Sequence, residues 1–217
     1  MQSRQSRQSR QSRQSTGAIF VRNYLINQWK EERNQNRWTV LPLEDDLEKV
    51  LIMFRFNEES PLFANLELVF QINFHEEHPF KPPSIKTHTP NGRTRPNTLL
   101  CIDGLTAYHP ESWSPVTTFS SIIERFINAF VDIENVDKGV GFMPIDEAAV
   151  KESISKSHAW NYEKYPDIMT QFIEQARMFS DMSQITEMTA RSTISSVCYG
   201  DSARPDDTTY HYSDDEE

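Results

Sequence analysis

The residue best suited to chemistry in this chain is Cys101, which lies in an unusual stretch of sequence. Seven of the twelve prolines fall between residues 78 and 115, and proline both fixes φ and removes a backbone donor. We therefore predict that residues 78–115, called here the thiol loop, form an ordered loop held against a scaffold. Cys101 is flanked by apolar residues and followed by Asp103-Gly104. This setting is typical of a positioned thiol.

Composition narrows the class of protein. The 217 residues suffice for one domain of about 150 residues plus tails. The formal net charge is −10, so we expect no nucleic-acid partner, because phosphate binding needs a basic face. No apolar run reaches the roughly 18 residues that cross a bilayer, and the N-terminus does not resemble a signal peptide. We expect a soluble protein without direct membrane insertion, cytoplasmic or alternatively nuclear.

The two cysteines, Cys101 and Cys198, do not form a disulfide framework. No Cys/His cluster has the spacing of a metal site, so we expect no metal. A reduced compartment with one reactive thiol is the simpler interpretation. Cys198 is expected to be an exposed residue of a polar tail.

The two ends of the chain have compositions that cannot form a core. Residues 2–13 are four copies of Gln-Ser-Arg, and residues 201–217 carry seven acids against one arginine. We predict a disordered segment over 1–17, a folded domain over 18–180 and a disordered acidic tail over 181–217.

The folded domain is predicted to begin with a helix and a set of strands. An amphipathic helix is expected over 18–33, with an apolar face that includes Ile19, Tyr24, Ile26 and Trp29. Alternating apolar residues and short polar gaps then predict an antiparallel meander. Its strands are expected at 38–43, 49–56, 66–74 and, as an edge strand, 84–89.

Helices are predicted to follow the thiol loop. Residues 119–131 have a broad apolar face that we expect to cover the sheet, with Thr117 or Thr118 as the N-cap. Two further helices are expected over 146–162, capped by Asp146, and over 166–179. The predicted fold class is α+β: helix, four-stranded antiparallel meander, active-site loop, then C-terminal helices.

The thiol loop resembles that of the ubiquitin-conjugating enzymes. The matching stretches are HPFKPPSIK (78–86), TPNGR (89–93), NT-x-LC (97–101) and YHPESWSP (108–115), followed by the SII of the next helix. The resemblance is closest to the branch associated with endoplasmic-reticulum quality control. Members of that branch usually end in a membrane-anchor helix, and we expect none here. The loop after Cys101 is also one residue longer, and Thr117 stands where the branch has a second tryptophan.

The resemblance implies an acyltransferase that works through a cysteine thioester. Cys101 would accept ubiquitin from the activating enzyme and pass it, with a ubiquitin ligase, to a lysine of a substrate protein. Serine and threonine are further acceptors to consider. No bound cofactor is implied, because ATP is used by the upstream activating enzyme. A thiolate is well suited to this role, since it attacks readily and its thioester remains reactive.

Two further residues are candidates for the chemistry. By resemblance, Asn91 would stabilise the oxyanion through its side-chain amide, but Asn-Gly is also a turn signal, so Asn91 can instead hold the loop. His109 is a candidate general base for hydroxyl acceptors, because histidine exchanges protons near neutral pH. The alternative is that His109 only supports the turn before Pro110.

Partner surfaces are also implied by the resemblance. In the family, one loop with Phe80 and Pro82 and another with Ser114 and Pro115 together bind the ligase. Phe80 packing inward is the alternative. Trp113 is predicted to anchor its loop in the core.

Basic residues of the first helix, Arg22, Lys30 and Arg33, are candidates for binding the activating enzyme. A solvated helix face is the equal alternative for them.

Two other functions remain open at this point. A non-catalytic ubiquitin-binding scaffold of the same fold would lack the thiol. A cysteine hydrolase would pair Cys101 with His109 and an acid such as Asp103, but the nucleophile of such enzymes normally opens a helix and pairs with a distant histidine.

Overall fold

The computed structural model describes residues 15–31, 37–43, 46–57, 60–134, 139–178 and 180. The predictions for Cys198, for Arg33 and for nearly all of both tails lie outside the described residues. Residues 1–176 and 177–217 make two separate units. The architecture below is that of the first unit.

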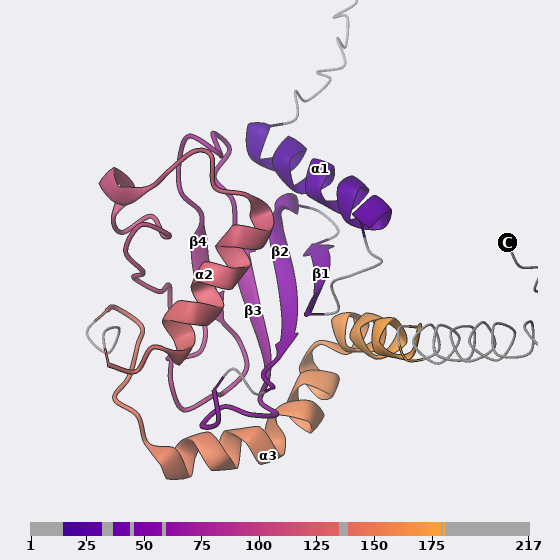
Figure 1. The fold of residues 1–217 in the computed structure, drawn as a ribbon, viewed down its shortest axis with the longest axis vertical. Coiled ribbons are helices and arrows are strands. Elements are labelled where there is room, and N and C mark those ends of the chain that lie inside the picture. The colour runs from indigo at the N-terminus through magenta and orange to yellow at the C-terminus, as the bar shows by residue number, and fades with distance from the viewer. Residues whose placement is uncertain are drawn as a thin grey trace, which may run out of the picture. The chain divides into compact units, whose positions relative to one another are not determined.

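A four-stranded antiparallel sheet forms the centre of the domain, in the order β1-β2-β3-β4 (Figure 1). The strands are β1 (Trp38–Leu43), β2 (Asp46–Arg55), β3 (Glu67–Asn73) and β4 (Ser84–Thr87). Strands that follow one another in sequence are paired, with one register shift between Pro42 and Leu43 in the pairing of β1 with β2. The predicted meander and the predicted α+β class are therefore confirmed.

One face of the sheet is covered by α2 (Phe119–Val131), which crosses it in Figure 1. Thr118 is the N-cap, and its side chain accepts a hydrogen bond from the backbone N–H of Ser121 at 3.2 Å. The rings of Phe70 and Phe126 pack with centroids 4.3 Å apart. The apolar face predicted for this helix is buried, and consists of Phe119, Ile122, Ile123, Phe126, Ile127 and Phe130.

The first helix, α1 (Thr16–Glu31), packs at one end of the sheet and contacts β2. The prediction of its buried face was wrong for Ile19 and Ile26, both of which are exposed. Val21 is buried instead, and Tyr24 stacks on Phe119 with ring centroids 3.8 Å apart. The helix rests on the end of α2 as well as on the sheet, so its contact residues do not follow one simple stripe.

The last described helices follow at the end of the sheet and on its opposite face. α3 (Glu147–Lys164), capped by Asp146 as predicted, runs past the end of the strands in Figure 1, and a helical segment over 166–176 covers the opposite face. Ile168 and Met169 of that segment pack with Leu51, Met53 and Val69 of the sheet. Residues 50–54 of β2 are consequently buried on both faces of the sheet.

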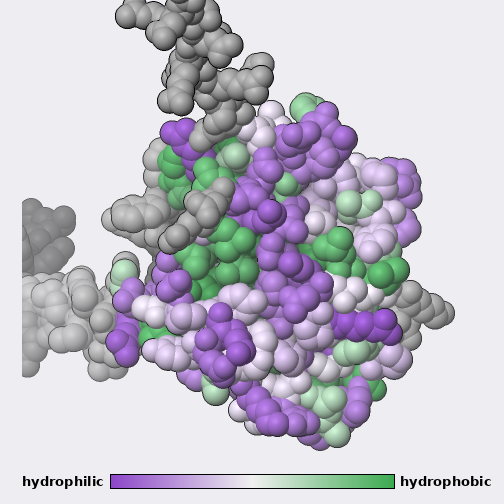
Figure 2. Space-filling model, turned by 180° about the vertical axis from the view of Figure 1, so that it is seen from behind, coloured by the Kyte–Doolittle hydropathy of each residue, from purple (hydrophilic) through white to green (hydrophobic). Residues whose placement is uncertain are grey.

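Seen from behind, hydrophobic and hydrophilic side chains alternate in patches over the surface of the molecule (Figure 2).

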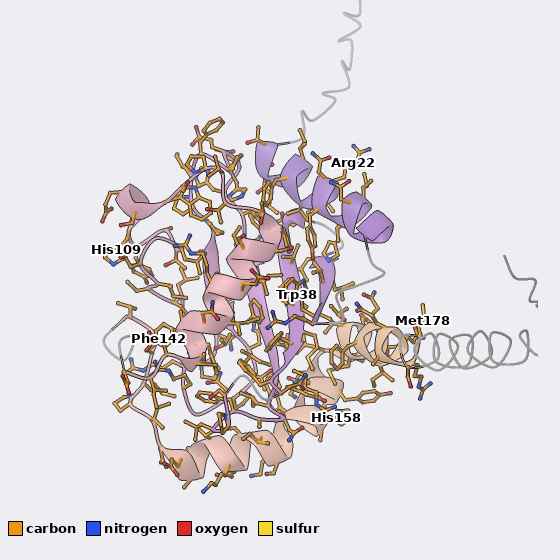
Figure 3. All side chains as sticks on the ribbon, viewed as in Figure 1. Arg22, Trp38, His109, Phe142, His158 and Met178 are labelled. Atoms are coloured by element: carbon orange, nitrogen blue, oxygen red, sulfur yellow. The ribbon has the colours of Figure 1, made fainter. Side chains whose placement is uncertain are left out.

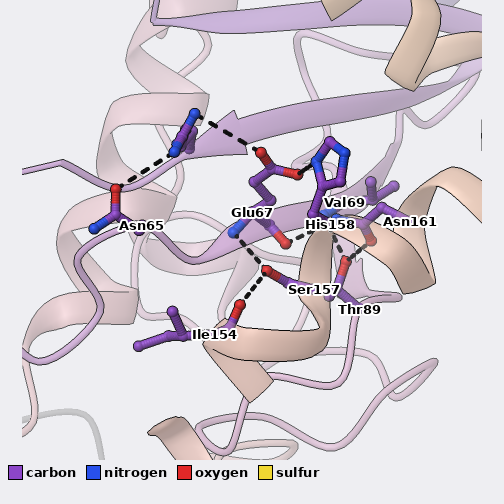
Figure 4. A network of polar contacts seen from close by, with 9 residues as sticks. Asn65, Glu67, Val69, Thr89, Ile154, Ser157, His158 and Asn161 are labelled. Carbon is purple, nitrogen blue, oxygen red and sulfur yellow. Dashed lines mark hydrogen bonds and ion pairs between the residues drawn. The ribbon is translucent and has the colours of Figure 1, made fainter. Parts of the chain in front are cut away.

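Glu67, the first residue of β3, is buried beneath α3 (Figure 4). The carboxylate of Glu67 lies 2.9 Å from Nδ1 of His158. Asn161 donates to the backbone carbonyl of Glu67 at 2.9 Å and accepts from the hydroxyl of Thr89 at 2.6 Å. The alternation that predicted β3 therefore separates two buried environments, one apolar and one hydrogen-bonded.

Candidate active site around Cys101

The thiol loop is ordered and mostly irregular, as predicted. Apart from β4, its regular structure is the short 3-10 helix η1 (Pro110–Ser112). Trp113 is buried, and its indole N–H donates to the carbonyl of Pro79 at 2.7 Å. The prediction that Trp113 anchors the loop is confirmed, and the same bond ties the two ends of the loop together.

Cys101 lies in an extended stretch held from both sides. Leu100 N–H donates to the carbonyl of Ile85 in β4 at 2.8 Å, and Cys101 N–H donates to the carbonyl of Val140 at 2.9 Å. Gly139 packs so closely that a Cβ there would lie 2.6 Å from the carbonyl oxygen of Cys101. The side chains before and after Cys101 are buried, while the thiol is half-buried. The sulfur is thus fixed in position and accessible.

A tight turn after Cys101 brings His109 back to the sulfur. Thr106 closes the turn: its N–H donates to the carbonyl of Ile102 at 3.0 Å, and its hydroxyl accepts from Ile102 N–H at 2.9 Å. His109 N–H then donates to the carbonyl of Thr106 at 3.2 Å. Nε2 of His109 lies 3.2 Å from Sγ of Cys101, at the edge of the domain seen in Figure 3. The structure therefore brings the two predicted residues together.

A carboxylate that the sequence did not single out completes this group. Nδ1 of His109 lies 3.4 Å from Oε1 of Glu111. The acid beside His109 is thus Glu111, two residues further along the chain. The spacing His-Pro-Glu was visible in the sequence, but only the turn of η1 directs the carboxylate back to the ring.

Cys101 and His109 open into one hollow of about 480 Å³ between the thiol loop and α2. The hollow has room for an acyl group beside the sulfur and for an approaching nucleophile. Its polar lining comes from both elements and includes acids, an arginine and an amide. The lining residues are Cys101, Ile102, Asp103, His109, Arg125, Asn128, Ala129, Asp132 and Gly139.

Asn91 does not line the hollow that contains the thiol of Cys101. It is 1% exposed and lines a separate hollow beside α3. Its amide donates to the carbonyl of Thr89 and to the hydroxyl of Thr94, both at 2.9 Å. Its side-chain oxygen accepts from Arg93 N–H and Thr94 N–H, both at 2.8 Å. These contacts show a loop-holding role for Asn91, and the oxyanion role stays a prediction.

The surface predicted to bind a ligase is partly exposed. Phe80 is 74% exposed, so it does not pack inward. Ser114 and Pro115 are also exposed, whereas Pro82 is buried behind this surface. Ligase contact stays a prediction for the three exposed residues, and Pro82 can only support them.

The basic face of α1 is described in part. Arg22 is exposed (Figure 3), while the side chain of Lys30 lies outside the described residues. Among the described residues, no cluster of His, Cys, Asp and Glu is arranged to hold a metal. No helix in the described part of the chain is long and apolar enough to cross a membrane.

No family model matches this chain. Comparison with individual known proteins finds similar sequences. The chain is 31% identical over 107 residues to ubiquitin-conjugating enzyme E2 6 of Debaryomyces hansenii, covering 46% of this chain and 43% of that protein. It is 30% identical over 118 residues to ubiquitin-conjugating enzyme E2 J2 of Mus musculus, covering 51% and 43%. Over about half of its length, the chain is similar to ubiquitin-conjugating enzymes. The predicted resemblance is confirmed.

Other relatives extend this comparison. Ubiquitin-conjugating enzyme E2 34 of Arabidopsis thaliana is 28% identical over 152 residues, which cover 70% of this chain and 62% of that protein. The chain thus spans less than half of the first two relatives and under two thirds of the third. Among solved structures, human ubiquitin-conjugating enzyme E2 G1 matches with a TM-score of 0.45 and 19% identity, over 54% of this chain and 96% of that chain.

Proposed function

We propose that this protein is a ubiquitin-conjugating enzyme that carries ubiquitin as a thioester on Cys101. The observation that supports this most directly is the fixed, half-buried thiol with His109 Nε2 at 3.2 Å, in a chain related to ubiquitin-conjugating enzymes. The loop backbone holds the sulfur still, and the adjoining hollow leaves room for the acyl group. No bound cofactor is needed, because the activating enzyme uses the ATP.

Loading is a transfer between two thiols. The Cys101 thiol gives its proton to Nε2 of His109, and the thiolate attacks the carbonyl carbon of ubiquitin's thioester on the activating enzyme. The bond from that carbon to the activating enzyme's sulfur breaks as the bond to Sγ forms. The leaving thiolate takes up a proton, so the acyl group moves without a change in oxidation state.

Discharge places His109 next to the acceptor. A hydroxyl or amine attacks the thioester carbon, and His109 Nε2 takes the proton from the attacking atom. The C–S bond then breaks, and the proton passes from the imidazolium to the departing sulfur. A hydroxyl is far less acidic than a protonated amine, so it gains more from this base. We therefore propose serine and threonine as acceptors in addition to lysine.

The proposed partners are ubiquitin, the activating enzyme, a ubiquitin ligase and a substrate protein. Exposed Phe80, Ser114 and Pro115 form the candidate ligase surface, and exposed Arg22 is a candidate contact of the activating enzyme. Aromatic and proline side chains suit such a surface because they bury area with little loss of conformational freedom.

A second candidate function is that of a cysteine hydrolase, in which Cys101 would be the nucleophile. The contacts of Cys101 with His109, and of His109 with Glu111, favour this candidate, because such an enzyme needs a base beside the thiol and an acid beside the base. Cys101 nevertheless lies in an extended loop, not at the start of a helix. The hydrolase should cleave ubiquitin–lysine bonds without the activating enzyme, and the conjugating enzyme should not.

One loading experiment separates these functions. The protein is incubated with ubiquitin, activating enzyme and ATP, and the products are separated with and without a reducing thiol. The proposal predicts an adduct one ubiquitin heavier that requires ATP and disappears on reduction. A non-catalytic ubiquitin-binding scaffold would give no adduct, and that result would reject the proposal.

A further inference from the structure

Three side chains of the thiol loop are joined by two successive contacts, from Cys101 to His109 and from His109 to Glu111. Sγ of Cys101 is 3.2 Å from Nε2 of His109, and Nδ1 of the same ring is 3.4 Å from Oε1 of Glu111. A neutral imidazole carries a proton on one nitrogen only, whereas an ionised carboxylate can only accept hydrogen bonds. A carboxylate at Nδ1 therefore keeps the proton there and leaves Nε2 as the acceptor beside the sulfur.

The backbone that carries Glu111 is fixed on both sides. Ser112 N–H donates to the carbonyl of His109 at 3.2 Å, and Trp113 N–H donates to the carbonyl of Pro110 at 3.3 Å. Trp113 is itself buried and bonded to Pro79. The side chain of Glu111 is exposed, but its backbone cannot move away from His109 without breaking this turn.

We propose that Glu111 is a positioning residue that sets the tautomer and orientation of His109. With Nδ1–H directed at Glu111, Nε2 is the base that faces Cys101 and any acceptor beside it. When Nε2 takes a proton from the acceptor, the carboxylate stabilises the imidazolium that forms. This inference rests on the proposed function for its catalytic consequence, but not for the tautomer.

Other charged groups face the same hollow and provide controls. Asp103 comes from the turn after Cys101, and Arg125 and Asp132 come from α2 and its C-terminal end. Among the described contacts, none joins the Asp103 carboxylate to His109. Asp103→Asn therefore removes one negative charge from the hollow without removing the carboxylate at Nδ1, which makes it the matched control for Glu111→Gln.

The tautomer is tested by nitrogen NMR of His109 in the unloaded full chain at pH 7.5. The expected spectrum of the wild type and of Asp103→Asn shows a protonated Nδ1 and an unprotonated Nε2. Glu111→Gln should raise the share of the Nε2–H form, because a glutamine amide can donate as well as accept. A wild type already dominated by the Nε2–H form would overturn the proposal, whether or not the protein carries ubiquitin.

The catalytic consequence is tested by discharge of the loaded protein onto free serine. Glu111→Gln should slow discharge about tenfold, the scale of one lost hydrogen bond to a charged group, while Glu111→Asp should restore part of the rate. When residue 109 is already alanine, adding Glu111→Gln should cause no further loss. An unchanged rate in Glu111→Gln, or a further loss in the double variant, would overturn the positioning role. Failure of the wild type to load would instead reject the proposed function, and the NMR result would still decide the tautomer.

Discussion

Two histidines of the thiol loop lie in contrasting environments, and their environments indicate different roles. His109 is half-buried beside the sulfur, with polar partners on both ring nitrogens. His78 is 0% exposed and is surrounded by the rings of Phe20, Phe74 and Trp113. The first contacts a thiol and a carboxylate, whereas burial among aromatic rings favours the neutral form of the second.

We expect His109→Ala to slow discharge onto serine by about 10²-fold or more, the usual scale for loss of a general base. Discharge onto free lysine should be slowed less. The rates are measured after the variant has been loaded to completion and freed of activating enzyme. If discharge onto serine and onto lysine were slowed equally, or not at all, His109 would be left with the role of supporting the turn before Pro110.

Burial lowers the pKa of His78 to about 4, against about 6.5 in an unfolded chain. Between these values the unfolded chain binds a proton that the folded chain does not, so stability is full above about pH 6.5 and falls as the pH falls toward 4. The loss from this group is up to about 1.4 kcal/mol per pH unit. Urea unfolding of the wild type and of His78→Gln at pH 7 and pH 5 checks this.

The difference in unfolding free energy between pH 7 and pH 5 should be smaller in His78→Gln than in the wild type. Burial also lowers the pKa of His88, so part of the acid sensitivity should remain in the variant. Parallel pH dependences in the two proteins would contradict the assignment to His78.

At the scale of the elements, Arg93 joins the thiol loop to the end of α2. It is fully buried, and its guanidinium donates to the backbone carbonyls of Phe130 (3.3 Å), Asp132 (2.8 Å) and Met143 (3.3 Å). A cation near the C-terminal carbonyls of a helix is favourable, since these groups lack intrahelical partners. The segment that flanks Cys101 at Val140 is therefore tied to α2 through one side chain.

Arg93→Met should lower the free energy of unfolding by about 2–4 kcal/mol, because three buried carbonyls lose a charged donor. The control is Arg95→Met, two residues away on the same loop and exposed, which should change stability by less than about 0.5 kcal/mol. Urea unfolding followed by tryptophan fluorescence measures both. Similar losses in the two variants would show that Arg93 does not have this role.

The sequence predicted those elements whose signals are local. β1 was predicted with its observed bounds, and β2 and β3 to within three residues. The cap Asp146 was predicted correctly, and Thr118 is one of the two caps predicted for α2. Alternation and side-chain caps act between near neighbours in the chain, so they are readable without tertiary structure.

Features that depend on contacts across the fold could not be predicted in this way. The buried side of α1 was misassigned at Ile19 and Ile26, because it depends on contact with Phe119, the residue at which α2 begins. The burial of Glu67 depends on His158, 91 residues away. In the site, Cys101 was predicted from its loop and from the resemblance, and His109 from the chemistry of histidine. The contact between Glu111 and His109 could not be predicted, because it depends on the direction of one turn.

At the scale of the whole molecule, the core formed by the described residues lies between Phe20 and Phe172. One face of the sheet is covered by α2 and the other by the helical segment 166–176, and α3 adds Val150 to the core on the α2 side. Neither the Gln-Ser-Arg repeat nor the acidic end has an apolar face in its sequence to add to this core.

A fragment of residues 15–180 should therefore load ubiquitin to the same extent as the full chain. The comparison uses equal concentrations of both proteins, with circular dichroism to confirm folding. A fragment ending at residue 164 is the informative control, because it removes Ile168 and Met169 from the sheet and should be destabilised. A folded 15–180 fragment that loads poorly would show that the ends contribute to the activity.

The central claim is that the sulfur of Cys101 carries the acyl group, and substitution of the two cysteines tests it most directly. Each variant is incubated with ubiquitin, activating enzyme and ATP, and the adduct is followed by intact mass and by its resistance to a reducing thiol. We predict a reducible adduct for the wild type and for Cys198→Ala, none for Cys101→Ala, and a thiol-resistant oxyester for Cys101→Ser. Loss of the adduct in Cys198→Ala, with retention in Cys101→Ala, would contradict the account.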